Sequence, residues 1–236
     1  MSREKEVVKT FSRQYEKRGI GAQRWYPNTE LLSFLGCYGF MGNSEGNRNK
    51  KALEVGCGSG ANLWMLAKEG FDTYGVDGSE EAIKLADKHL RAKWNVEAKL
   101  STGFFHELPY ESEMFDIVVD VVSLQHLDLE MSQHALREIM RVLVDGGLFY
   151  SYRLSDRSAM YMNSGGQYID SVTVSDITTD HMPLAHNGTM SFWSANRVME
   201  EYGACGLCVE SIERCTRTYQ NGLMEVEYLS ITAKKD

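Results

Sequence analysis

The stretch Ala52-Leu-Glu-Val-Gly56-Cys-Gly-Ser-Gly60 decides the fold of this 236-residue chain. Four residues typical of a short buried strand run directly into three glycines at alternate positions, and Ala61–Lys68 then follows with helical character. Glycine lets the backbone turn sharply and lets a ligand approach atoms that a Cβ would block, while a helix start offers unpaired N–H groups. The stretch therefore predicts a ligand site at a strand-to-helix junction.

An acidic residue follows at the distance that a nucleoside site requires. Thr73–Val76 reads as a second strand, and Asp77 ends it about twenty residues after the glycine turn. A carboxylate at this place can accept hydrogen bonds from both hydroxyls of a ribose. Strand, glycine turn, helix, strand and acid in this order indicate nucleoside binding.

Strands and helices continue to alternate beyond Asp77, which is typical of a parallel sheet with crossover helices. The last two strands flank Asn221-Gly222, a strong hairpin signal, so we expect the final strand to run antiparallel to its neighbours. The fold class is α/β, a Rossmann-like doubly wound sheet of seven strands, mostly parallel, with helices on both faces. The later elements are predicted as a helix from Ser79 to about Trp94, a strand over Ala98–Ser101, a strand over Ile117–Val122, a helix over Leu129–Leu143, and strands over Leu148–Tyr152, Val209–Thr218 and Glu225–Ala233.

Two segments fall outside this alternation. Residues 1–49 begin with Val7, Val8, Phe11 and Tyr15 at helical spacing, which predicts an amphipathic helix and an N-terminal helical lid that carries substrate contacts. Residues 50–236 form the core, and within it residues 155–190 have little periodicity and are long for a plain loop. We interpret that stretch as an insertion over the active site.

Composition narrows the class of protein. The formal net charge of −8 argues against a nucleic-acid partner, because such binding draws on clustered Lys and Arg. The sequence contains no apolar run long enough to span a bilayer and does not begin with a secretory signal. Five cysteines without a disulfide spacing are typical of a reducing compartment. We therefore expect a cytoplasmic enzyme without a membrane partner; the sequence does not indicate an oligomeric state.

The identity of the nucleoside stays open at this point. Gly56, Gly58 and Ala61 also satisfy the relaxed dinucleotide fingerprint, so a nicotinamide-dependent oxidoreductase is one alternative and a catalytically silent nucleoside-binding subunit is another. Against the reductase stand Glu54 just before the turn, the absence of a Tyr-x-x-x-Lys pair, and the terminal antiparallel hairpin.

Taken together, the landmarks resemble the class I S-adenosylmethionine-dependent methyltransferases, in particular those that act on small molecules. The resemblance covers about residues 50–234 and implies S-adenosyl-L-methionine as the cofactor and S-adenosyl-L-homocysteine as its product. It rests on Ala52–Gly60, Val76-Asp77, Glu107-Leu-Pro-Tyr110 before Phe115-Asp116-Ile-Val, Gln125-His126-Leu, and Arg141-Val-Leu-Val-Asp-Gly-Gly147.

The resemblance also implies roles for individual residues. It places Gly56, Cys57 and Gly58 near the methionine part and ribose of the cofactor, with Glu54 organising the turn. Asp77 would bind the ribose hydroxyls, and Gly78, Phe104 and Phe105 would surround the adenine. Asp120 and Val121 would form the floor of the site near the methionine moiety. One position departs from the family, which often has Asp where this chain has Phe104, so stacking or backbone contacts would replace a carboxylate acceptor for the adenine amine.

Other candidate residues come from the lid and from the ends of later strands. By analogy with related small-molecule methyltransferases, Tyr15, Arg24 and Trp25 close the cofactor site, with Arg24 on the methionine carboxylate; the alternative is that they are core aromatics and a surface arginine. We expect an in-line methyl transfer to an oxygen or nitrogen of a small molecule. The candidates around the acceptor are His126 as a general base or a structural group, and Gln125, Tyr152, Arg153 and Trp193 as substrate contacts; no residue set suggests a metal site.

Overall fold

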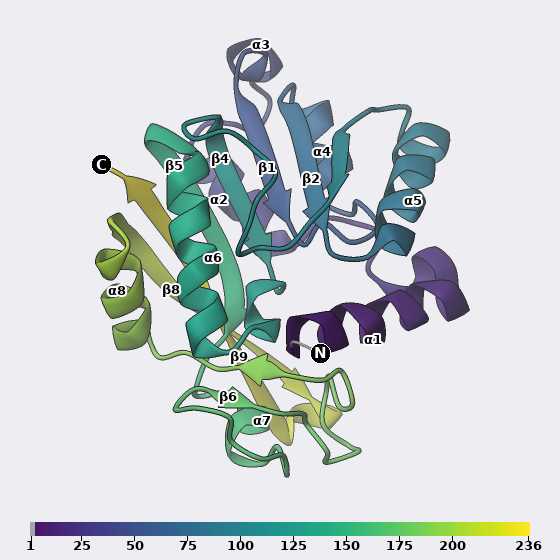
Figure 1. Ribbon diagram of the computed structural model, residues 1–236, viewed down its shortest axis with the longest axis vertical. Helices are drawn as coiled ribbons and strands as arrows, with labels where there is room; N and C mark the ends of the chain where they lie inside the picture. The colour runs from purple at the N-terminus through teal and green to yellow at the C-terminus, as the bar shows by residue number, and fades with distance from the viewer. Residues whose placement is uncertain (1–2) are drawn as a thin grey trace.

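The computed structural model describes residues 3–236. Its centre is a seven-stranded sheet in the order β3-β2-β1-β4-β5-β9-β8 (Figure 1). The bounds of these strands are β1 Lys51–Val55, β2 Asp72–Asp77, β3 Lys99–Thr102, β4 Phe115–Val121, β5 Leu143–Leu154, β8 Leu207–Tyr219 and β9 Met224–Lys235.

The predicted direction of the strands is confirmed. Strands β1 to β5 are parallel, and β9 runs antiparallel to both β5 and β8. Since the order of the strands reverses beside β1, the crevice for ligands is expected at the carboxyl ends of β1, β2 and β4. Val55 is in register with Val76 on one side and Asp120 on the other, so these three ends meet at one edge.

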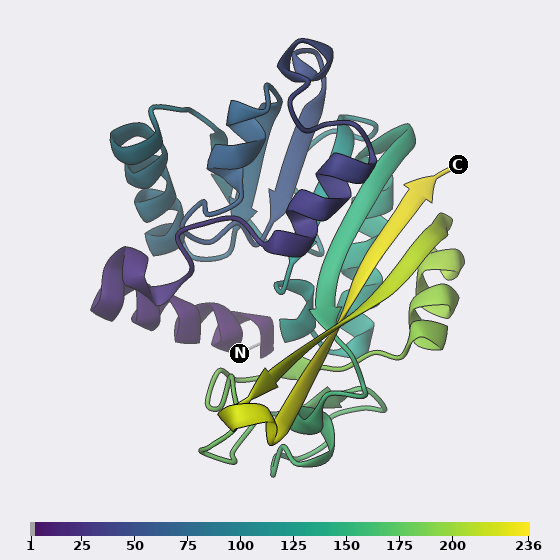
Figure 2. The same cartoon turned by 180° about the vertical axis from the view of Figure 1, so that it is seen from behind.

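Helices cover both faces of the sheet, as predicted. Helices α6 (Leu129–Val142) and α8 (Ala195–Ala204) pack on the face toward the viewer in Figure 1. Helices α2 (Thr29–Cys37) and α4 (Leu63–Lys68) pack on the opposite face, where Figure 2 shows α2 lying across β5. Apolar side chains from both faces of the central strands enter these two layers. The core is therefore one sheet between two helical layers.

The N-terminal 49 residues are not all lid. Helix α1 (Arg3–Arg18) lies below the carboxyl ends of the strands (Figure 1), but α2 belongs to the core, with Phe34 stacked on Tyr150 of β5 at 4.8 Å between ring centroids. Asn28 caps α2 by accepting hydrogen bonds from the backbone N–H groups of Glu30 and Leu31. The Asn cap and the apolar residues behind it are the sequence signals of this unpredicted helix.

The remaining elements are short, and small differences from the predicted boundaries have local causes. The helix predicted from Ser79 to Trp94 ends as α5 at Glu80–His89 and continues as a wider π-helical turn over Leu90–Trp94. The insertion 155–190 contains α7 (Ala159–Met162) and β6 (Thr173–Val174), which pairs with β7 (Met190–Ser191). Helix α3 (Ser44–Asn47) is a single turn before β1. Within residues 3–236, no helix combines the length and the apolar character that crossing a membrane needs.

Candidate active site

The glycine turn after β1 has a backbone that only glycine adopts easily. Gly56, Gly58 and Gly60 have φ values of 67°, 52° and 82°. A Cβ at Gly56 would lie 2.2 Å from the hydroxyl oxygen of Ser123, and one at Gly58 would lie 2.7 Å from that of Tyr15. The turn is therefore closely approached both by the segment after β4 and by the N-terminal helix.

Asp77 joins this turn to the start of α5. One carboxylate oxygen accepts a hydrogen bond from the backbone N–H of Gly58 at 2.9 Å, and the other accepts from the N–H of Ser79 at 2.9 Å. Burial raises the pKa of Asp77, whereas these two backbone donors lower it. The carboxylate lines the cavity described below and keeps lone pairs that can accept further hydrogen bonds.

An acidic and a basic side chain, the buried Glu54 and the half-buried Arg24, line the cavity near the turn. Glu54 accepts a hydrogen bond from Asn62 at 2.5 Å through Oε1, while its buried Oε2 has no partner among the described residues. Burial raises the pKa of Glu54 to about 8, against the opposing effects of the Arg24 charge and of Asn62. Nε of Arg24 is also buried without a partner in the described part of the chain. Buried polar atoms without partners are uncommon, so this pair is suited to a polar ligand.

A cavity of about 300 Å³ joins these groups to the end of β4. Its residues come from α1 and the segment after it, the glycine turn, the ends of β2 and β3, the turn after β4, and the insertion. The lining comprises Val7, Val8, Phe11, Gln14, Tyr15, Arg18, Ala22, Gln23, Arg24, Glu54, Gly56, Cys57, Gly58, Ser59, Ala61, Asp77, Gly78, Gly103, Phe104, Phe105, Val121, Val122, Ser123, Gln125, His126, Leu127, Leu184, Asn187 and Met190.

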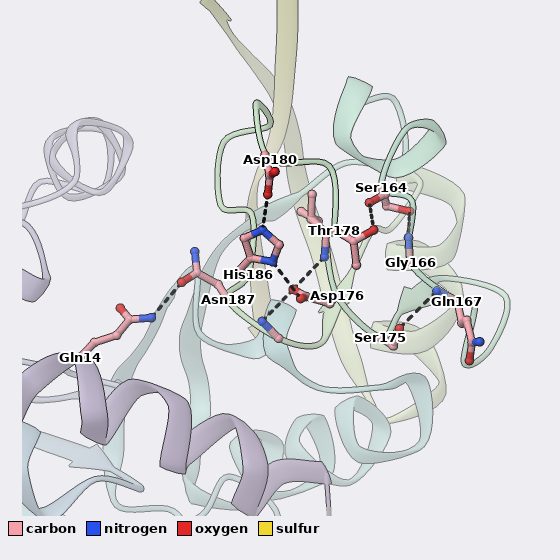
Figure 3. A network of polar contacts seen from close by, with 12 residues as sticks. Gln14, Ser164, Gly166, Gln167, Ser175, Asp176, Thr178, Asp180, His186 and Asn187 are labelled. Carbon is pink, nitrogen blue, oxygen red and sulfur yellow. Dashed lines mark hydrogen bonds and ion pairs between the residues drawn. The ribbon is translucent and has the colours of Figure 1, made fainter.

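Helix α1 and the insertion together form the roof of this cavity. Gln14 of α1 donates a hydrogen bond from Nε2 to the side-chain oxygen of Asn187 at 2.9 Å, a contact between residues 173 positions apart (Figure 3). Beside Asn187, the ring of His186 is hydrogen-bonded to Asp180 at 2.7 Å and lies 3.6 Å from a carboxylate oxygen of Asp176. This network holds the loop of the insertion that meets the N-terminal helix.

The turn after β4 is held in an unusual backbone conformation. Val122 has a φ of +59°, which a β-branched residue rarely adopts. Asp120 is fully buried and accepts hydrogen bonds from the N–H groups of Ser123 and Leu124 at 2.9 and 3.0 Å. The Ser123 hydroxyl donates to the carbonyl of Gly56 at 3.0 Å. The turn is thus fixed from inside the sheet and tied to the glycine turn.

Gln125 and His126 of this turn line the cavity. Nδ1 of His126 lies 3.0 Å from the carbonyl oxygen of Thr189, so this nitrogen carries the hydrogen and Nε2 is left with a lone pair. Burial lowers the pKa of His126 to about 4, against the opposing effect of the Thr189 carbonyl. The side chain of Gln125 is buried, and Oε1 has no hydrogen-bond partner among residues 3–236.

Most of the residues singled out by the sequence come together around this cavity, and five do not. Those on its wall are Tyr15, Arg24, Glu54, Gly56, Cys57, Gly58, Asp77, Gly78, Phe104, Phe105, Val121, Gln125 and His126. Those absent from its lining are Trp25, Asp120, Tyr152, Arg153 and Trp193.

The five residues have other surroundings. Trp25 is 42% exposed, with Lys93 4.1 Å above its ring. Asp120 points back into the turn that it caps, and Tyr152 stacks on Tyr228 with 4.8 Å between ring centroids. Arg153 and Trp193 are fully buried against each other, the guanidinium lying 3.6 Å from the ring centroid. A position at the end of a strand predicts which edge of the sheet a residue occupies, but it does not predict the direction in which the side chain points.

Several lining residues were missed by sequence reasoning. Val8 and Phe11 belong to the predicted apolar face of α1, and that signal indicated packing without a particular partner. Ser123, which touches the glycine turn, follows the predicted β4 strand directly, so its position at the sheet edge was a usable signal. Leu184 and Asn187 lie in the aperiodic insertion, where no local pattern marks them. Among residues 3–236, no group of three or more His, Cys, Asp or Glu side chains is arranged to hold a metal ion.

Known proteins share this sequence pattern and fold. A family model described as a methyltransferase domain matches residues 53–151. The ubiquinone biosynthesis O-methyltransferase of Aliivibrio fischeri is 26% identical over 191 residues, which cover 79% of this chain and 79% of that protein. The matches to several other curated relatives span about half of those proteins' length.

Solved structures resemble nearly the whole chain. An S-adenosylmethionine-dependent methyltransferase from Methanosarcina mazei matches with a TM-score of 0.70 at 18% identity, over 89% of this chain and 98% of that one. The 1,6-didemethyltoxoflavin-N1-methyltransferase of Burkholderia thailandensis matches with a TM-score of 0.67 at 16% identity, over 100% of this chain and 92% of that one. In the matched domain at residues 53–151 and in its strand order, the chain is similar to the class I S-adenosylmethionine-dependent methyltransferases.

Proposed function

We propose that this chain transfers the methyl group of S-adenosylmethionine to an oxygen or nitrogen atom of a small molecule by in-line displacement. The observation that carries the proposal is the continuous cavity that connects the Asp77 edge of the glycine turn with the uncharged end at Gln125 and His126. One end has the groups that a nucleoside needs, and the other offers space next to them for an acceptor.

The residues present are suited to the cofactor. Asp77 would accept hydrogen bonds from the ribose hydroxyls, and Phe104 and Phe105 would enclose the adenine. The unpartnered atoms of Arg24 and Glu54 match the carboxylate and the amino group of a methionine moiety. When bound, the cofactor supplies an electrophilic methyl group on a sulfonium.

The chain's own contribution is position and the exclusion of water. An in-line displacement requires the acceptor atom to be held opposite the leaving sulfur, and enclosure strengthens the polar contacts that hold it there. Phe11 from α1 and Leu184 and Met190 from the insertion supply apolar cover. His126, whose ring meets that of Phe11 edge to face at 4.8 Å between centroids, holds a lone pair at Nε2 that can take a proton from the acceptor.

The size of the cavity supports a small acceptor. A cavity of about 300 Å³ is at the lower end of the range for ligand pockets, and both α1 and the insertion contribute residues to its wall. The net charge of −8 further disfavours nucleic acid. The names of two matched proteins refer to ubiquinone biosynthesis and to 1,6-didemethyltoxoflavin, which are small-molecule settings.

Calorimetry tests the cofactor half of the proposal. We expect S-adenosylmethionine and S-adenosylhomocysteine to bind and NAD to bind at least about a hundred-fold more weakly. Asp77→Asn should weaken binding of S-adenosylhomocysteine, whereas the matched variant Asp72→Asn, which alters a carboxylate at the other end of β2 that bonds Lys99, should leave it unchanged. Tighter binding of NAD would favour the oxidoreductase alternative instead.

A turnover screen tests the transfer half. Purified protein and S-adenosylmethionine are incubated with phenols, amines, heterocycles and sugars, and S-adenosylhomocysteine production is followed. We expect turnover with a member of these classes. Cofactor binding combined with activity on RNA or protein alone would refute the small-molecule proposal, and binding without turnover on any acceptor would favour the silent-subunit alternative.

A further inference from the structure

The turn Val122–Leu127 is built more rigidly than a connection from β4 to α6 requires. Val122 is held at a positive φ, and one carboxylate oxygen of Asp120 accepts hydrogen bonds from the backbone of Ser123 and Leu124. The other oxygen accepts from the Ser151 hydroxyl of β5 at 2.7 Å, which anchors Asp120 to the sheet. Backbone strain of this kind persists only where the surroundings enforce it, and it concentrates at functional sites.

A second support comes from below, through a buried arginine. Arg153 donates from Nη2 to the hydroxyl oxygen of Ser191 at 3.0 Å, and that hydroxyl donates to the backbone carbonyl of Gln125 at 3.2 Å. The Arg153 guanidinium is packed against Trp193 and is fully buried. Burying a cation carries a large desolvation penalty. Because this penalty is large, we infer that the contacts from Arg153 through Ser191 are kept for the position that they give to Gln125.

The two side chains that this turn presents are uncharged and have free hydrogen-bonding capacity. Nε2 of His126 is an acceptor because Nδ1 donates to Thr189, and Oε1 of Gln125 accepts no hydrogen bond from any described residue. A carboxamide can both donate and accept. Together they form an uncharged edge that matches a ligand with a hydrogen-bond donor beside a complementary polar group.

The charged lining residues lie elsewhere. Glu54, Asp77 and Arg24 are grouped at the glycine turn, and Arg18, the fourth, is an exposed residue at the end of α1. His126 meets the ring of Phe11 and the carbonyl of Thr189, which carry no charge, and the remaining lining residues are apolar or neutral. A carboxylate or an ammonium placed there would lose its hydration without gaining a counter-charge.

We propose that the methyl acceptor is an uncharged small molecule that presents an O–H or N–H donor beside a carbonyl-type acceptor, and that Gln125 and His126 select it by binding this edge. The inference rests on the proposed function for the presence of the cofactor at the other end of the cavity. Lactams, hydroxy-ketones and hydroxylated heterocycles have such an edge.

The same arrangement accounts for the proton that is lost when the oxygen or nitrogen of the O–H or N–H group is the atom that is methylated. The bond between sulfur and methyl carbon breaks as the new bond to oxygen or nitrogen forms, the sulfonium becomes a neutral thioether, and the O–H or N–H proton passes to Nε2 of His126. Because burial lowers the pKa of His126 to about 4, the imidazolium would return this proton to water readily at neutral pH.

The test uses four probes of similar size on protein saturated with S-adenosylhomocysteine, with affinities from ligand-observed NMR titrations. 2-Pyridone has the donor–acceptor edge, N-methyl-2-pyridone lacks the donor, benzoate is an anion and benzylammonium is a cation. We expect 2-pyridone to bind about ten-fold more tightly than each of the others, as one hydrogen bond to a buried partner would give.

Variants identify the residues that select. Gln125→Met and His126→Phe should each bring 2-pyridone within about two-fold of N-methyl-2-pyridone, while Gln167→Met, at an exposed position of the insertion, should leave the preference intact. The affinity of each variant for S-adenosylhomocysteine reports that it is folded. Equal binding of all probes, no binding of any, tight binding of a charged probe, or a preference that survives both substitutions would overturn the inference.

Different results would refute the proposed function and the inference about the acceptor. If the wild-type protein does not bind S-adenosylhomocysteine, the methyltransferase proposal falls whichever probe binds. If S-adenosylhomocysteine binds and the probes show no preference, the donor–acceptor edge alone is refuted.

Discussion

Replacing Gly56 with alanine tests the contact between the glycine turn and the turn after β4. Gly56 has a φ of +67°, and a Cβ there would lie 2.2 Å from the hydroxyl oxygen and 2.3 Å from the Cβ of Ser123. Ser123 cannot withdraw easily, because the backbone of its turn is held by Asp120. The substitution must therefore displace one of the two turns that line the cavity.

The expected loss of stability has three parts. The left-handed conformation costs an L-residue about 1–2 kcal/mol, and overpacking against Ser123 costs about 1–3 kcal/mol more. Reduced freedom of the unfolded chain offsets about 0.4–1 kcal/mol of this loss. Gly56→Ala should thus lower the free energy of unfolding by about 1–5 kcal/mol. Gly222→Ala is the matched control, since Gly222 has a φ of +87° but no atom within 4 Å of the position that a Cβ would take; it should cost at most about 1.5 kcal/mol.

Urea unfolding followed by tryptophan fluorescence gives these free energies, and calorimetry gives the affinity for S-adenosylhomocysteine. Gly56→Ala should weaken that affinity, whereas Gly222→Ala should not. Adding Ser123→Gly to Gly56→Ala removes the clashing side chain and should recover part of the loss, with a coupling free energy of about 1–3 kcal/mol. If the two substitutions are additive within about 0.5 kcal/mol, the contact with Ser123 is not the cause and the reasoning is refuted.

Three further predictions follow from the charges of the site. Arg24→Met removes the cation that opposes the effect of burial on Glu54, so the pKa of Glu54 should rise further. A raised pKa of an acid in the folded state makes the free energy of unfolding fall as pH rises. In urea unfolding, the variant should therefore lose more stability relative to wild type at pH 9 than at pH 6. Burial raises the pKa of Asp77, so calorimetry should show affinity for S-adenosylhomocysteine decreasing on acidification at a higher pH than an ordinary aspartate would give, and Asp77→Asn should abolish that decrease. Burial lowers the pKa of His126 to about 4, so kcat/KM should stay level from pH 8 to about 5.5. A decline in kcat/KM centred near pH 6.5 that disappears in His126→Gln would show that His126 titrates like an ordinary histidine and would contradict the lowered pKa.

The sequence by itself determined the parts of this protein that depend on local backbone properties. Alternation of strands and helices predicted the sheet, and Asn221-Gly222 predicted the hairpin that makes β9 antiparallel. Glycines at 56 and 58 predicted a sharp turn, which the structure makes with positive φ at both, and Asp77 was placed at the end of its strand by position alone. Such features are readable because period, turn chemistry and strand ends are set within a few residues.

Only the tertiary structure decided which side chains face the cavity. Asp120 and Arg153 stand at the ends of central strands, yet both turn inward, where their hydrogen bonds hold the turn Val122–Leu127. The roof depends on Gln14 and Asn187, which meet only because the sheet brings α1 and the insertion to the same edge. The direction of a side chain at a sheet edge, and contacts between segments far apart in the chain, are set by packing of the whole molecule, and no local pattern in the sequence encodes them.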